Sequence, residues 1–150
     1  MEIHCIGLSH KTAPLEYIEK AQMTTAHLRA GMERMNSRGG DLKRDLLEMV
    51  LLSTCNRTEL YTVLEGDDPE LLHELMANAS GIPLEDLRPY LYHHSGMAAL
   101  NHLMSVAAGL ESMVIGEPQI LGQVTDAYSQ SISDGSSGLI LGKCFHTAIH

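Results

Sequence analysis

Two apolar runs separated by only five residues constrain the fold of this chain more than any other feature. Residues 48–53 read EMVLLS, residues 59–65 read ELYTVLE, and TCNRT lies between them. Short apolar runs of this kind are typical of strands, and so short a connection favours pairing of the two strands as a hairpin. The sequence therefore predicts an antiparallel strand pair with TCNRT at its turn.

Further elements flank this hairpin on both sides. The apolar run at residues 2–8 predicts a strand, and Thr24 or Thr25 can cap a helix. A second helix is predicted after Asp68, and residues 90–94 predict a last strand. The order strand, helix, strand, strand, helix, strand is the split βαβ pattern. We therefore predict an α+β, ferredoxin-like fold, with an antiparallel sheet and helices on one face.

After residue 94 the pattern becomes helical. Two amphipathic segments are followed by a linker, SDGSSG, at residues 133–138, and then by the start of another helix. No capping signal closes that last helix, so we interpret the chain as a fragment cut inside a helix. We divide it into a ferredoxin-like core at residues 1–94 and a helical extension at residues 95–150.

The composition excludes several classes of protein. The chain has 150 residues with 44% hydrophobic and 19% charged residues, which is a globular profile. It has no apolar run long enough for a membrane span and no secretory signal, so we expect a cytoplasmic protein that does not contact membranes. The formal net charge of −9 argues against non-specific nucleic-acid binding, because phosphate binding needs clustered cations.

Cys55 is the candidate nucleophile among the three cysteines. They are odd in number and widely spaced, which disfavours disulfides and a structural zinc site. Cys5 lies in an apolar strand and Cys144 lies beside a phenylalanine, so both fit a buried structural role. Cys55 lies between polar residues, and the cation of Arg57 nearby can lower a thiol pKa. Arg57 could also bind a substrate carboxylate, or it could be a solvated charge paired with Glu59.

The nine histidines do not predict a metal site. His93 and His94 are adjacent and face opposite sides of a strand, and His4 and His10 have no partners at ligand spacing. We therefore expect no metal. His102 lies on a helix away from most of its apolar positions, so it either faces a polar pocket, where it could carry protons, or faces solvent.

Three longer motifs together resemble the glutamyl-tRNA reductase family. These are GLSHKTAP at residues 7–14, LSTCNRTELY at 52–61 and AAGLESMVIGEPQILGQV at 107–124, in order over essentially the whole chain. The resemblance implies the N-terminal catalytic domain of an NADPH-dependent oxidoreductase in tetrapyrrole (porphyrin and haem) biosynthesis. Members of this family reduce glutamyl-tRNA to glutamate-1-semialdehyde and release the free tRNA.

The resemblance also implies roles for particular residues. Cys55 would attack the aminoacyl ester to form a thioester, and His102 matches a histidine that the family needs for activity. Thr54, Asn56 and Arg57 flank the nucleophile in the substrate-binding stretch, with Arg57 placed to bind the glutamate side chain. Further substrate-contacting positions match Ser112, Glu117, Pro118, Gln119 and Gln123.

The family's cofactor and partners lie outside this chain. No GxGxxG follows a predicted strand, so NADPH is expected to bind a domain absent here, and residues 95–150 would complete the active site and start the link to it. The resemblance further implies glutamyl-tRNA as substrate, a homodimer formed through an absent C-terminal domain, and an aminomutase as a candidate partner. Two alternatives remain open, namely a non-catalytic ferredoxin-like binding module and a thiol hydrolase that acts on esters.

Overall fold

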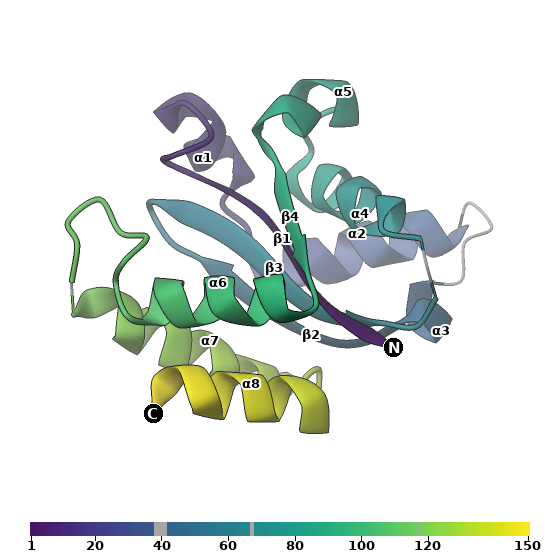
Figure 1. Cartoon of the computed structure of the whole chain (residues 1–150). Coiled ribbons are helices and arrows are strands. Elements are labelled where there is room, and N and C mark those ends of the chain that lie inside the picture. Colours follow the sequence, from purple (N-terminus) through teal and green to yellow (C-terminus); the bar gives the residue numbers. More distant parts are fainter. Residues whose placement is uncertain (38–41, 67, 117) are drawn as a thin grey trace.

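The computed structural model describes residues 1–37, 42–66, 68–116 and 118–150, and its strands form one antiparallel sheet (Figure 1). The order across the sheet is β2-β3-β1-β4, with every neighbouring pair antiparallel. This is the strand order of a split βαβ fold, so the predicted ferredoxin-like class is confirmed. The strands are β1 (Glu2–Ser9), β2 (Leu46–Ser53), β3 (Arg57–Leu64) and β4 (Tyr92–Ser95).

The predicted helices form close to their expected positions, and their ends follow local capping chemistry. The Thr24 hydroxyl accepts a hydrogen bond from the His27 N–H at 3.3 Å, and the Asp68 carboxylate accepts one from the Glu70 N–H at 3.2 Å. No helix in the described ranges is long and apolar enough to cross a membrane. The helical elements are α1 (Leu15–Ala21), α2 (Thr25–Ser37), α3 (Leu42–Asp45), α4 (Glu70–Ser80), α5 (Leu84–Leu87), η1 (Arg88–Tyr90), α6 (Met97–Ala107), α7 (Gln119–Asp134) and α8 (Leu139–Ile149).

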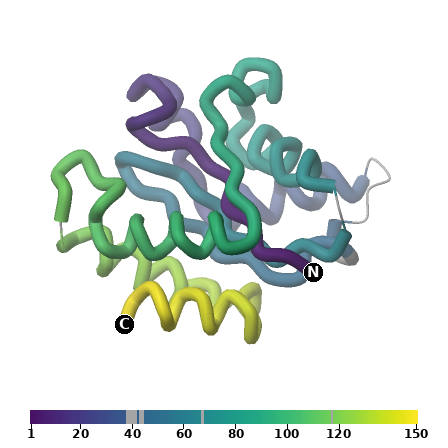
Figure 2. Tube along the Cα trace, viewed as in Figure 1, coloured from purple at the N-terminus to yellow at the C-terminus, as the bar shows by residue number. Residues whose placement is uncertain are grey.

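Helices cover both faces of the sheet. Helices α2 and α4 lie on one face, as the ferredoxin-like pattern predicts, and α6, α7 and α8 cover the other (Figure 1). The tube view shows the C-terminal helix α8 running below the sheet beside α7 (Figure 2). The extension therefore packs on the sheet itself, and it encloses a second apolar core there.

The β2–β3 hairpin forms where the two apolar runs predict it. Ser53 pairs with Thr58 and Leu52 pairs with Glu59, so only residues 54–56 remain in the connection. Along β3, side chains alternate between the two faces of the sheet. Leu60 belongs to the core beneath α2 and α4, whereas Tyr61 belongs to the core beneath α6, α7 and α8.

Candidate active site

Cys55 lies at the tip of the β2–β3 turn with its side chain exposed. Thr54 shapes this turn, because its hydroxyl accepts hydrogen bonds from the N–H groups of Asn56 at 3.1 Å and Arg57 at 3.2 Å. The Thr54 N–H in turn donates to the Arg57 carbonyl at 2.8 Å. The thiol is thus held outward on a turn whose own backbone groups are satisfied.

Two other segments hold this turn from the side. The His10 N–H, in the loop after β1, donates to the Asn56 carbonyl at 3.0 Å. The Gln22 side chain, after α1, donates to the Thr54 carbonyl at 3.4 Å. Segments from the first 22 residues therefore fix the position of the hairpin tip. This explains how so short a turn can hold the Cys55 side chain in a defined position.

Arg57 is buried beneath this turn and is only 2% exposed. Its Nη1 lies 3.4 Å from Glu59 Oε2, and its Nη2 donates to the Glu111 carbonyl in the loop between α6 and α7. Lys11 reaches the same loop through an ion pair with the Glu111 carboxylate at 2.7 Å. The interpretation of Arg57 as a solvated charge is wrong because the α6–α7 loop covers it, whereas its pairing with Glu59 is confirmed.

Glu59 is the centre of a buried polar network on the same face of β3. It is 0% exposed, and its carboxylate accepts hydrogen bonds from the hydroxyls of Tyr92 at 2.6 Å and Tyr61 at 2.8 Å. The same carboxylate forms an ion pair with His102. Burial by itself would raise the pKa of Glu59. The hydrogen bond and charge of His102, together with Arg57 and Tyr92, outweigh burial and hold that pKa below its usual value.

His102 faces this network from α6. Its ring lies against Glu59 and stacks on His94 of β4, with centroids 4.6 Å apart and planes 29° apart. Of the two interpretations left open, the polar pocket is therefore the one that the structure supports. The Glu59 carboxylate thus fixes the orientation of the His102 imidazole.

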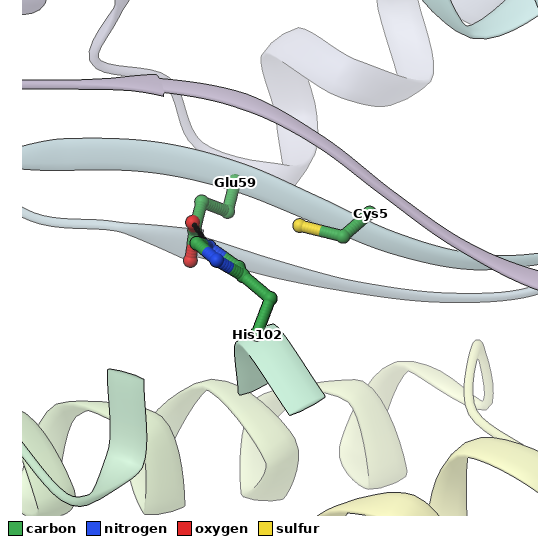
Figure 3. Close-up of side chains that lie close together, drawn as sticks. All are labelled: Cys5, Glu59 and His102. Carbon is green, nitrogen blue, oxygen red and sulfur yellow. Dashed lines mark hydrogen bonds and ion pairs between the residues drawn. The ribbon is translucent and has the colours of Figure 1, made fainter. Parts of the chain in front are cut away.

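Cys5 lies next to Glu59 and His102, as Figure 3 shows. The Cys5 sulfur, a Glu59 oxygen and a His102 nitrogen all lie within 4.8 Å of one another. Burial first, and the Glu59 charge second, raise the pKa of the Cys5 thiol well above its usual value. Cys5 is therefore a buried, protonated thiol, as predicted, and is not a competing nucleophile.

The residues predicted in the α6–α7 region lie in different settings. Ser112 is buried, and it directly follows Glu111, whose carbonyl binds Arg57. Pro118 and Gln119 are exposed at the start of α7 and, among the described residues, make no hydrogen bond to the cysteine turn. Gln123 lines an open hollow of about 470 Å³ next to Ser53. Glu117 lies outside the described residues.

Glu59 is the site residue that the sequence analysis did not select. The sequence names Glu59 only as a partner of a solvated Arg57. Because side chains alternate along a strand, the period of two places Arg57 and Glu59 on the same face, and this spacing could have identified Glu59 as a buried site residue. Tyr92 could not be found in this way, since its contact with Glu59 requires the order of strands in the sheet.

The fold and the site together define a class of protein: a ferredoxin-like α+β domain with one exposed thiol on the turn before β3 and a buried Arg–Glu–His network that begins on that strand. The family model described as "Glutamyl-tRNAGlu reductase, N-terminal domain" matches residues 6–150. The chain therefore belongs to the family of glutamyl-tRNA reductase N-terminal domains.

Individual relatives agree with this assignment. The chain is 43% identical to a glutamyl-tRNA reductase of Oleidesulfovibrio alaskensis, over 98% of this chain and 32% of the relative. It is 40% identical to one of Alkalilimnicola ehrlichii, over 99% of this chain and 32% of the relative. The structure of glutamyl-tRNA reductase from Methanopyrus kandleri matches with a TM-score of 0.75 and 33% identity, over 98% of this chain and 32% of that one. The chain thus spans about a third of the length of these relatives.

Proposed function

We propose that this chain is the part of a glutamyl-tRNA reductase that forms the acyl-enzyme, with Cys55 as the nucleophile. The observation that supports this most strongly is the exposed Cys55 thiol, held on a hydrogen-bonded turn that ends at the buried Arg57. A nucleophile for ester chemistry has to be reachable by its substrate, and among the three cysteines Cys55 is the exposed one.

The reaction that we propose transfers the glutamyl group from oxygen to sulfur. The Cys55 thiolate attacks the carbonyl carbon of the aminoacyl ester, a C–S bond forms, and the C–O bond to the ribose of the tRNA breaks. The ribose oxygen takes a proton as it leaves. His102 is the proposed carrier of that proton, because its imidazole is held beside the Glu59 carboxylate.

Arg57 is the proposed partner for the side-chain carboxylate of the glutamyl group. A guanidinium can bind a carboxylate through two parallel hydrogen bonds, and burial strengthens such a contact. Its Nη2 already donates to the Glu111 carbonyl, so the incoming carboxylate would replace that carbonyl. The proposal thus includes a displacement of the Glu111 backbone when substrate binds. Thr54, Asn56, Ser112, Glu117, Pro118, Gln119 and Gln123 are proposed as further substrate contacts.

Reduction of the thioester needs a hydride from NADPH, which the family uses. The described residues of this chain do not fit that cofactor, because their sheet is antiparallel and lacks a glycine-rich turn between a strand and a helix. We therefore derive no hydride step from these residues and assign it to the longer protein. For that protein we also propose a cytoplasmic location, a homodimer and an aminomutase partner.

Mass spectrometry after incubation with glutamyl-tRNA tests the proposal. We expect a glutamyl adduct on Cys55, its complete loss in Cys55→Ser, and its retention in Cys5→Ser and Cys144→Ser. Loss of the adduct in all three variants, or no adduct on the folded wild-type chain, would refute the proposal. Release of free glutamate that depends on Cys55 would show that water hydrolyses the thioester, which is the hydrolase alternative.

A further inference from the structure

Two histidines from different strands meet on the face of the sheet opposite Glu59. His4 Nδ1 of β1 lies 2.9 Å from His93 Nε2 of β4. In the β1–β4 register, Ile6 is opposite His93, so His4 and His93 are diagonal neighbours on the same face. The expectation that His4 has no partner at ligand spacing is therefore wrong, because strand pairing supplies one that the sequence separation conceals.

This histidine pair opens into a hollow with further donor groups. The hollow has a volume of about 370 Å³, and its lining includes His4, His93, Glu2 and Ser95. Glu2 is two residues before His4 on β1, so it lies on the same face, and it is exposed, so its carboxylate is free to rotate. Two imidazole nitrogens and a carboxylate thus border one water-accessible space.

Both rings are suited to be ligands at neutral pH. Burial lowers the pKa of His4, and burial together with the charges of His4, His73 and His94 lowers the pKa of His93 to about 4. Neutral imidazole has the lone pair that a metal ion needs. One of the two facing nitrogens donates the hydrogen bond of the pair, so that ring has to carry its proton on its other nitrogen before both facing nitrogens can bind a metal ion.

The separation of the two nitrogens is close to that required by a metal. For a tetrahedral ion with metal–nitrogen bonds of about 2.0–2.1 Å, two ligand nitrogens lie about 3.3 Å apart. The present 2.9 Å contact has to open by only a few tenths of an ångström. His73 of α4 packs its ring 5.3 Å from that of His93, and its Nδ1–H donates to the Pro69 carbonyl at 3.2 Å.

We propose that His4 and His93, joined by the carboxylate of Glu2, bind a divalent transition-metal ion of the zinc type. Water completes the coordination from the hollow. The donor set of imidazole and carboxylate favours zinc over magnesium or calcium, which prefer oxygen ligands throughout. The site is independent of the proposed acyl transfer, because His93 faces away from Glu59 and Cys55.

The other candidate set, Cys5 with Glu59 and His102, is less suitable although its atoms lie closer together. The Glu59 oxygens already accept hydrogen bonds from Tyr61, Tyr92 and His102 and pair with Arg57. A metal ion there would have to displace these partners in a sealed interior. The His4–His93 pair requires the rotation of the exposed Glu2 side chain and a small opening of the contact between the two rings.

Calorimetric titration of Zn²⁺ into the 150-residue chain tests the proposal. The titration uses a Cys55→Ser background, because an exposed thiol also binds zinc. We expect one ion per chain with a dissociation constant of about 10 µM or tighter. His93→Gln should weaken binding at least about tenfold, and Glu2→Gln should weaken it by a smaller factor.

Matched variants decide between the two sites. His94→Gln changes the next residue of β4, which faces α6, so it should bind zinc as well as the parent does. No binding at about 100 µM Zn²⁺ would overturn the proposal. So would binding that His102→Gln abolishes and His93→Gln leaves intact, since this result would place the ion at Cys5 and Glu59. Glu2 is exposed, so Glu2→Gln gives a result even where His93→Gln unfolds the chain.

Discussion

The two faces of the sheet are built from the same four strands but bury different kinds of group. The face beneath α2 and α4 is mainly apolar, with Leu60 and Leu64 of β3 fully buried in it. The face beneath α6, α7 and α8 also has an apolar core, but Arg57 and Glu59 are buried at its end nearest the cysteine turn. Adjacent residues of β3 thus pack in an apolar core on one face of the sheet and form buried ion pairs on the other face.

This difference shows what the domain needs in order to bury charged groups at the strand that follows the cysteine turn. Apolar burial stabilises a fold by about 25 cal/mol per Å², whatever the exact geometry. A buried charge stabilises nothing unless its partners are present, because desolvation opposes it. The Glu59 network meets this condition with four partners from two strands and one helix. We therefore expect substitutions on the two faces to cause similar losses in the free energy of unfolding at pH 7 but to change its pH dependence differently.

The largest effect on stability that we predict is that of Glu59→Gln. Removal of this charge leaves Arg57 buried without a counter-ion, so the free energy of unfolding should fall by about 3–5 kcal/mol. Urea unfolding at pH 7 measures this change. A loss below about 1 kcal/mol would show that the network does not depend on the ionised carboxylate.

Leu60→Ala is the matched control, since it changes the next residue on the opposite face. It should cost about 2–5 kcal/mol through cavity formation. The pKa of Glu59 is lowered in the folded state, so its contribution is present above about pH 4.5 and is lost as the pH falls through the folded value. Leu60→Ala should keep this acid-induced loss of stability, whereas Glu59→Gln should lack it.

Sequence periodicity predicts the apolar face well and the charged face only in part. The strand and helix order was sufficient for the fold class, because hairpin length and apolar spacing depend on local chemistry. Helix α1 was not indicated, since it has seven residues and its burial rests on Ile18 and Ala21 alone. The helices after residue 95 were expected, but their position over the second face of the sheet depends on tertiary packing.

The candidate site shows the same division. The polar setting of Cys55 is a local property, and its exposure agrees with the prediction. The burial of Arg57 is not local, because the covering carbonyl comes from Glu111, 54 residues later in the chain. The contact between His4 and His93 likewise joins residues 89 positions apart. The first contact depends on how the α6–α7 loop packs and the second on strand order, and no short motif encodes either.

A smaller effect on the charged face is predicted for Gly7→Ala in β1. A Cβ atom at Gly7 would lie 2.4 Å from the Thr58 carbonyl and 2.9 Å from Glu59 Cγ, so the backbone would have to move. We expect a loss of about 1–3 kcal/mol in the free energy of unfolding, measured in urea. Gly122→Ala in α7 is the control, because a Cβ there meets no atom within 4 Å. It should stabilise the helix by up to about 1 kcal/mol, and equal losses in both variants would contradict the crowding argument.

The smallest predicted effect is on the other face, where His93→Gln should change the pH dependence of stability rather than its value at pH 7. The pKa of His93 is about 4 in the folded chain, against about 6.5 when unfolded, because of burial and the neighbouring histidines. The unfolded state therefore binds the proton first, and stability falls as the pH drops from about 6.5 to 4. The ring is partly exposed, so solvent screening reduces the effect, and His93→Gln should lessen this fall in the free energy of unfolding by about 1 kcal/mol. Urea unfolding at pH 7 and at pH 5 measures the difference. His150→Gln, at an exposed position, should leave the fall unchanged. If His93→Gln and wild type lose stability equally between these pH values, the half-buried histidine pair does not resist protonation.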